Sequence, residues 1–128
     1  MAKGKNQAMM EGAGRVLVKA TAEEALGLAL DIHGNLVEAT PVDTGHARIN
    51  WIPTTGAPAT HEVDGGGTSA PDPTAAFAAA PPGAPLYVTN NVPYIRKLNE
   101  GSSPQAPAGF VEKAVREAVD KRKGRRIG

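Results

Sequence analysis

Thr40-Pro41-Val42-Asp43-Thr44-Gly45 separates two stretches of the chain that have different periodicities. Pro41 biases Thr40 away from the helical region, so the hexapeptide should end a helix. Asp43 and Thr44 can bond local backbone groups in a turn, and Gly45 can take the positive φ of a sharp reversal. We therefore predict a structural turn motif, made of Thr40, Pro41, Asp43, Thr44 and Gly45, that leads from a helix into a strand.

The segment before the hexapeptide has a helical pattern from about Asn6 to Ala39. Its apolar residues step by four and three along one face: Val18, Ala22, Ala25, Ala29, Ile32 and Leu36. Gly12 and Gly14 each cost about 1 kcal/mol of helix stability relative to alanine, so we expect a bend near them. The pattern predicts a long N-terminal helix whose alanine-rich face allows another element to approach closely.

The segment after Gly45 changes to a period of two. Ala47, Ile49 and Trp51 alternate with Arg48, Asn50 and Ile52, which is typical of a half-buried strand. Pro53 and Gly56 should close it. Residues 86–90 (Leu-Tyr-Val-Thr-Asn) form a second predicted strand, rich in aromatic and β-branched residues.

The stretch between these strands, residues 57–85, is rich in alanine, proline and glycine. Apart from Val63 and Phe77, few of its side chains could anchor a core. This composition favours a long extended arm or loop over regular structure. Such an arm could become ordered against a neighbouring subunit.

The remaining segments are helical in pattern. Tyr94 to Leu98 predicts a short helix ending at Gly101, and a last helix should run from about Pro107 to Arg122. A basic tail, residues 121–128, follows. The chain is therefore expected to be a single α+β domain, residues 1–128. Its long N-terminal helix and its C-terminal helix should pack on a small antiparallel sheet with a long extended arm.

Composition excludes several kinds of site. The chain has no cysteine, so disulfides, thiolate nucleophiles and cysteine-based zinc sites are impossible. Three histidines, His33, His46 and His61, stand at spacings without metal-site character. No apolar run approaches the roughly 18 residues of a membrane span. We expect no cofactor, no metal and no membrane contact.

Two groups of residues are candidates for binding. Residues 113–128 hold seven of the fourteen lysines and arginines, and the last five of these form the basic tail: Lys121, Arg122, Lys123, Arg125 and Arg126. The tail could contact DNA phosphates, favour the end of the last helix, or dock on an acidic subunit. The aromatic residues Trp51, Tyr87 and Tyr94 could anchor a core or an interface.

Asp43-Thr44-Gly45 is also the triplet that carries the catalytic carboxylate of aspartic proteases. A dimeric protease of the retropepsin kind, using Asp43, is therefore one alternative function. Such an enzyme needs the triplet at the end of a buried strand, where two carboxylates share a proton. The stretch before Thr40 has a helical pattern instead, which argues against this reading. A small DNA-binding protein that uses the basic tail is the second alternative.

The ordered set of motifs resembles the neck and tail-completion proteins of long-tailed bacteriophages, the head–tail joining family. The resemblance rests first on a long helix, the hexapeptide, and a stretch bearing Arg48 and Trp51. It continues in residues 87–94 (Tyr-Val-Thr-Asn-Asn-Val-Pro-Tyr), 98–101 (Leu-Asn-Glu-Gly) and 105–110 (Gln-Ala-Pro-Ala-Gly-Phe). It covers roughly residues 15–120, and the long 57–85 stretch departs from the family pattern.

The resemblance implies a structural virion protein without catalytic residues. It implies a homo-oligomeric ring, expected to be a hexamer, acting as a tail-completion or tail-terminator protein. Its expected partners are copies of itself, head-closure and connector proteins, and the tail tube protein. Genomic DNA would pass through the ring. The expected location is the virion neck, assembled in the cytoplasm of the bacterial host.

Overall fold

The computed structural model describes residues 7–19, 22–41, 45–63, 70–78, 80–81, 83–104 and 106–127. Nine elements follow one another within these ranges. They are β1 (Gln7–Met10), β2 (Arg15–Lys19), α1 (Ala22–Ala39), α2 (Gly45–Arg48), β3 (Ile52–Thr55), α3 (Pro73–Ala78), β4 (Leu86–Thr89), α4 (Ile95–Asn99) and α5 (Phe110–Ile127).

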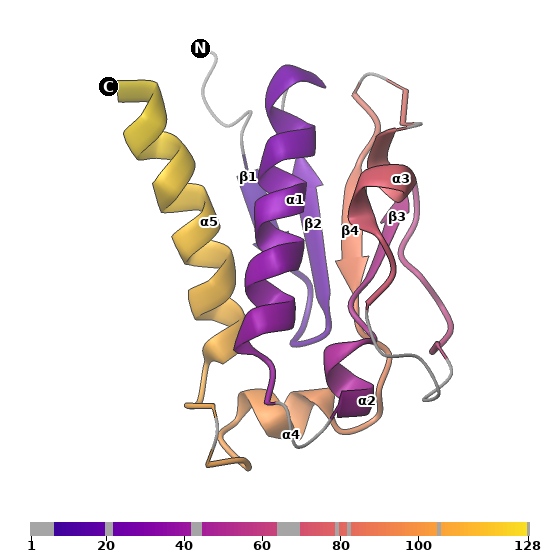
Figure 1. Ribbon diagram of the computed structural model, residues 1–128, viewed down its shortest axis with the longest axis vertical. Coiled ribbons are helices and arrows are strands. Elements are labelled where there is room, and N and C mark those ends of the chain that lie inside the picture. The colour runs from indigo at the N-terminus through magenta and orange to yellow at the C-terminus, as the bar shows by residue number, and fades with distance from the viewer. Residues whose placement is uncertain are drawn as a thin grey trace.

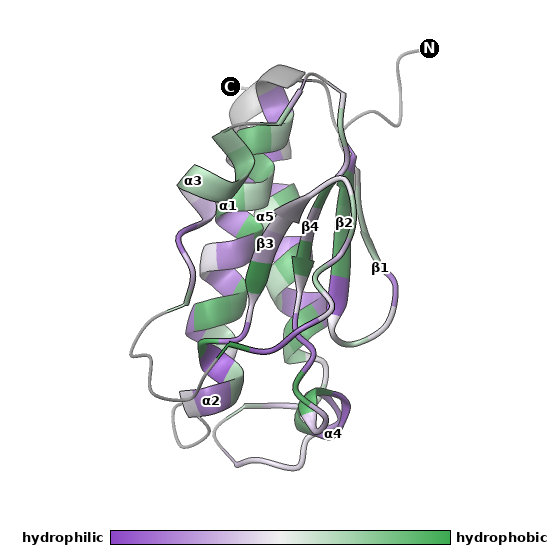
Figure 2. Ribbon diagram, turned by 90° about the vertical axis from the view of Figure 1, so that its right-hand side faces the viewer, coloured by the Kyte–Doolittle hydropathy of each residue, from purple (hydrophilic) through white to green (hydrophobic). Residues whose placement is uncertain are grey.

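The described elements form two layers. One layer is a four-stranded sheet in the order β1-β2-β4-β3, in which every neighbouring pair is antiparallel. The other layer consists of α1 with α5 on one side of it and α3 on the other (Figure 1). Seen edge-on, α1, α3 and α5 all lie on the same face of the sheet (Figure 2). The α+β class, with the long helices packed on an antiparallel sheet, is confirmed.

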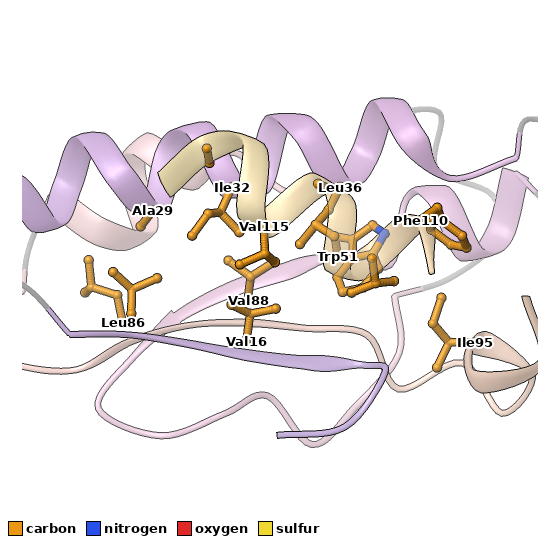
Figure 3. Close-up of a cluster of buried hydrophobic side chains, with 14 of the residues drawn as sticks. Val16, Ala29, Ile32, Leu36, Trp51, Leu86, Val88, Ile95, Phe110 and Val115 are labelled. Carbon is orange, nitrogen blue, oxygen red and sulfur yellow. The ribbon is translucent and has the colours of Figure 1, made fainter. Parts of the chain in front are cut away.

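A single apolar core fills the space between the two layers. Val16 and Val88 project from the sheet towards Ile32 of α1 and Val115 of α5 (Figure 3). The predicted apolar face of the last helix is confirmed, because Phe110, Val111, Ala114, Val115 and Ala118 are all buried and Val119 is half-buried. Small residues at Ala29, Ala114 and Ala118 let the two helices lie close to each other and to the sheet.

The described part of the predicted N-terminal helix that precedes residue 20 is a β-hairpin, which corrects the sequence-based prediction. β1 pairs with β2, and β2 pairs in turn with β4. Val16 and Val18 are fully buried by this pairing, whereas Arg15 and Lys19 are exposed. Gly12 supplies the hairpin turn with a φ of 116°. Long-range pairing and burial have outweighed a helical spacing that was real only from Ala22 onward.

The predicted strand over residues 47–52 is also wrong. Gly45–Arg48 forms one helical turn, α2, and the strand β3 starts only at Ile52. The period of two was misleading because Asn50 and Ile52 are buried together with Ala47 and Trp51. Pro53 lies inside β3, which an edge strand tolerates.

The 57–85 segment carries a helix in its described part, contrary to the expectation of an extended arm. α3 buries Phe77, and Thr55 Oγ1 of β3 donates to the carbonyl of Ala76 at 3.1 Å. The alanine-rich composition gave no clear helical signal. One phenylalanine and several alanines are nevertheless enough to pack a short helix against the edge of a sheet. Residues 64–69, 79 and 82 lie outside the described residues.

The remaining predictions hold, with shifted boundaries for the last helix. β4 matches the predicted strand, and α4 is followed by Gly101 with a φ of 100°. α5 begins at Phe110, after Gly109 with a φ of 81°, and continues to Ile127. The predicted basic tail therefore belongs to the end of a helix as far as Ile127.

Candidate functional site

Thr40, the first residue of the hexapeptide, follows the end of α1 and belongs to a buried chain of hydrogen bonds. The Trp51 indole N–H donates to Thr40 Oγ1 at 2.8 Å, and Thr40 Oγ1 donates to the carbonyl of Leu36 at 2.6 Å. His33 Nε2 lies 2.9 Å from the carbonyl oxygen of Trp51, a geometry that fits an N–H donor on Nε2. Trp51 is thus held on both its side chain and its backbone, and it serves as a core anchor with no exposed area.

Arg48 also serves the end of α1. Its Nε donates to the carbonyl of Val37 at 2.9 Å. A cation is favourable there, because the last carbonyls of a helix carry partial negative charge. Arg48, one of the residues on which the resemblance rests, therefore forms its hydrogen bond inside the domain.

The turn itself differs from the prediction in one described residue. Gly45 begins α2 and does not have a positive φ, so the chain does not reverse its direction through that residue. The chain leaves one helix, α1, and enters another, α2. Thr40 and Pro41 are buried beside this connection, whereas Asp43 and Thr44 lie outside the described residues. The described element before Asp43 is α1, as the argument against a protease required.

Three asparagines hold the loops at the same end of the domain. Asn50 Oδ1 accepts from the Val63 N–H at 2.7 Å, and Asn90 Nδ2 donates to the carbonyl of Ala47 at 2.9 Å. Asn99 Oδ1 accepts from the N–H of Val111 at 2.9 Å, in the first turn of α5.

These bonds explain two of the motifs that carry the resemblance. Asn90 belongs to the Asn-Asn-Val-Pro-Tyr segment and Asn99 to the Leu-Asn-Glu-Gly segment. In each, a buried amide bonds backbone groups of a loop or of the end of a helix: Asn90 bonds the Ala47 carbonyl and the Val92 N–H, and Asn99 bonds the Val111 N–H. Both motifs therefore hold loops in place within the described structure.

The other two aromatic candidates are more accessible than Trp51. Tyr87 is half-buried on β4, and Tyr94 precedes α4 with 37% of its surface exposed. The structure thus separates the three candidate anchors. Trp51 belongs to the core, whereas Tyr94 is exposed and Tyr87 is partly accessible.

The basic end of α5 is only partly free. Arg122 Nε donates to Asp31 Oδ2 of α1 at 3.1 Å, and both side chains are mostly buried. Gly27 makes room for this pair, because a Cβ there would collide with the Arg122 guanidinium. Lys121 is exposed. The side chains of Lys123, Arg125 and Arg126 lie outside the description, although their backbone is helical.

The histidines have structural surroundings. Burial lowers the pKa of His33, which the hydrogen bond to Trp51 and the charge of Asp72 only partly oppose. His46 Nε2 lies 2.7 Å from Glu62 Oε1 on the surface. Within the described residues, no group of three potential metal ligands comes together.

The face of the sheet opposite the helices is the surface that sequence reasoning missed. Met9, Leu17, Tyr87 and Thr54 are cross-strand partners that form one row across the four strands. No described helix covers this face (Figure 2). The run Arg15-Val16-Leu17-Val18-Lys19 after two glycines was the available signal, since it alternates and is rich in β-branched residues.

A second accessible surface is an apolar groove of about 160 Å³ between α1 and α3. Leu26 of α1 and Ala78 of α3 border it, and both are exposed. Phe77 and Leu86 also line it, and none of its lining residues is charged. An apolar side chain from another molecule would fit the chemistry of this groove.

Comparison with known proteins returned no matching family model, no matching curated protein and no matching solved structure. Among the described helices, none is both long enough and apolar enough to cross a membrane.

Proposed function

We propose that this chain is a structural protein of a phage neck, which forms a homo-oligomeric ring between the head connector and the tail tube. The observation that carries the proposal is the sheet face that no described helix covers, where Met9 on the edge strand β1 is 40% exposed and Tyr87 is half-buried, although Leu17 between them is buried. An edge strand with an accessible apolar side chain is a surface on which another subunit can pack. The motif resemblance supplies the kind of assembly, a ring of the tail-completion or tail-terminator type.

The roles of the motif residues support an assembly protein over an enzyme. Thr40, Arg48, Asn90 and Asn99 are all bonded to groups of the domain itself. These bonds fix the loops at one end, so the surfaces on the two layers are presented rigidly. A rigid subunit loses little conformational entropy when it joins a ring.

The basic end of α5 supports contact with DNA or with an acidic neighbour. Lys121 is exposed, and the helix carries the backbone of Lys123, Arg125 and Arg126 onward to Ile127. Clustered cations bind phosphates without reading sequence. A ring whose channel passes DNA would use such a helix end.

A test in the virus addresses the function directly. Phage particles made without this chain should accumulate as DNA-filled heads and separate tails, and adding the purified chain should join them. Mass spectrometry of complete particles should detect the chain. Normal joining in its absence, or its absence from complete particles, would overturn the proposal.

Two further arms distinguish the alternatives. A protease would lose activity in Asp43→Asn, whereas a neck protein carrying this change should still join heads to tails. A free DNA-binding protein would shift DNA in a gel, with a strong dependence on salt. That shift should disappear when residues 121–128 are removed.

A further inference from the structure

We propose that the ring is closed by a contact between the β1–β2 patch of one copy and the α1–α3 groove of the next. The β1–β2 patch consists of Met9, Arg15, Leu17 and Lys19 on the open sheet face. The α1–α3 groove is the apolar groove described above, together with Asp72 at the start of α3. The inference rests on the proposed function, because it names the subunit contact of that ring.

The β1–β2 patch presents an apolar side chain between two cations. Ala8 and Met10 pack against the core, so Met9 points to the opposite face of the sheet. Met9 is 40% exposed and lies across from Leu17, which is buried. Arg15 and Lys19 lie two residues on either side of Leu17, on the same face and about 7 Å away. Glu11 pairs with Arg15 at 3.6 Å, whereas Lys19 has no ion pair with any residue in the described part of the chain.

The α1–α3 groove is a suitable receptor for Met9. Its volume is about 160 Å³, close to that of apolar cavities of about 150 Å³ that accept benzene. A methionine side chain is unbranched and flexible, so it adapts to an irregular apolar surface. Met9 is also one of three large apolar residues that the described structure leaves exposed, with Leu26 and Tyr94. Leu26 itself borders the groove.

Charge distinguishes the two surfaces. Between Lys19 and Arg96 the sequence contains eight acidic residues and one basic residue, Arg48. Arg48 is engaged at the end of α1. Of those acids, Asp72 is the one that belongs to the groove surface, since Asp31 pairs with Arg122 and Glu62 with His46, whereas the β1–β2 patch contributes two cations. The two surfaces are therefore complementary in sign.

Asp72 is the acidic residue that we expect to pair with a cation of the β1–β2 patch. It is exposed and directly precedes α3, whose six residues span about 9 Å. The groove lies at the other end of α3, around Ala78. With Met9 in the groove, a cation one row away on the patch comes within reach of the Asp72 carboxylate. The apolar contact and the charge contact thus have matching spacing.

The positions of the surfaces suit a ring. β1 forms one edge of the sheet, and α3 packs on β3 at the other edge. The groove is lined by residues of α1 and α3, and these helices lie on one face of the sheet (Figure 2), whereas Met9 of the patch points to the opposite face. The β1 edge of each copy would therefore lie against the α1–α3 side of the next copy. Such a contact joins two different surfaces, as a closed ring requires, and not one surface to itself.

Disulfide trapping tests the contact, because the chain has no cysteine of its own. Met9→Cys and Ala78→Cys place one thiol in each surface, at exposed positions that the fold tolerates. An oxidised mixture of the two variants should form a mixed dimer, and the double variant should form a ladder of oligomers. Met9→Cys mixed with Gly34→Cys is the matched control, since Gly34 is exposed on α1 away from the groove.

The outcomes separate the possible contacts. Dimers of Met9→Cys alone, at the yield of the mixture, would indicate a two-fold edge contact and overturn the inference. Equal trapping with Gly34→Cys, or no trapping at any soluble concentration, would also overturn it. If the chain joins heads to tails and yet shows no Met9–Ala78 link in particles carrying the double variant, the contact is wrong while the proposed function stands.

Sedimentation of the full chain provides the second measurement. Lys19→Glu and Asp72→Asn should each weaken self-association at least about threefold. The asparagine keeps an oxygen for the Thr74 N–H, which Asp72 accepts at 2.9 Å. Lys97→Glu, an exposed charge reversal on α4, should leave association unchanged. Equal weakening by all three variants would contradict a specific contact.

Discussion

Trp51 donates its indole N–H to the hydroxyl of Thr40 at 2.8 Å, and neither side chain is accessible to solvent. This bond connects the first residue of the hexapeptide to the largest side chain of the core. It connects Thr40 to the core of the domain, and Thr40 in turn donates to the last turn of α1. Its role in the described structure is to orient Trp51.

Thr40→Val should destabilise the domain by about 1 to 3 kcal/mol, because it leaves the buried Trp51 N–H without an acceptor. Thr40→Ser keeps the hydroxyl and should lose much less. Urea unfolding followed by tryptophan fluorescence measures both, since Trp51 is the only tryptophan. Equal losses in the two variants would mean that removing the methyl group costs as much as removing the hydroxyl, which would contradict a dominant role of the hydrogen bond.

Gly14→Ala should destabilise more severely than an ordinary glycine replacement. A Cβ at Gly14 would collide with the backbone carbonyl oxygen of Asn90. The Asn90 N–H also donates to the Gly14 carbonyl, and this bond holds the hairpin against the segment after β4. Backbone cannot yield as a side chain can, so we expect a loss of at least about 2 kcal/mol.

Gly34→Ala is the matched control for that change. Gly34 lies within α1, and a Cβ there meets nothing within 4 Å. Alanine is the better helix former, so this variant should gain up to about 1 kcal/mol. Thermal unfolding of the two variants should therefore move in opposite directions, and a parallel shift would contradict the close approach at Gly14.

The helices of the second half were predictable because local signals and burial agree there. Phe110, Val111 and Ala114 sit at helical spacing, and Gly101 has the positive φ that its position after α4 suggested. The first half was harder for a physical reason. Val18 fits a helical stripe with Ala22 and Ala25, yet pairing of β2 between β1 and β4 buries it in a sheet.

The candidate surfaces were less predictable than the elements that carry them. Met9 could be placed on the sheet face opposite the helices only once the hairpin was known, and the groove depends on α3, whose alanines gave no strong signal. Trp51 was predictable as a core residue from the scarcity of aromatic side chains. The bond partner of Arg122 was not, because Asp31 is 91 residues away in the sequence.

Thr89→Val should stabilise the domain. Thr89 is buried, and its hydroxyl has no hydrogen-bond partner in the part of the chain that the structure describes. Valine has nearly the same shape and removes the unsatisfied group, so a gain of about 1 kcal/mol is expected. Thr55→Val is the control, since the Thr55 hydroxyl donates to Ala76 and its loss should destabilise. A destabilised Thr89→Val would show that a partner, such as a bound water, satisfies the hydroxyl in solution.

Stability should fall as the solution is acidified below about pH 6.5, because of His33. Burial lowers the pKa of His33 from the ordinary value of 6.5, so the folded protein keeps this imidazole neutral while the unfolded chain takes up a proton. The unfolded state then binds more protons, and the free energy of unfolding decreases as pH falls from 6.5 towards the folded-state pKa. The slope due to one histidine is at most about 1.4 kcal/mol per pH unit. His33→Gln can still donate to the Trp51 carbonyl but cannot titrate, so urea unfolding between pH 7.5 and 5 should show a smaller loss in that variant. Identical pH profiles of the two proteins would contradict a buried, neutral His33.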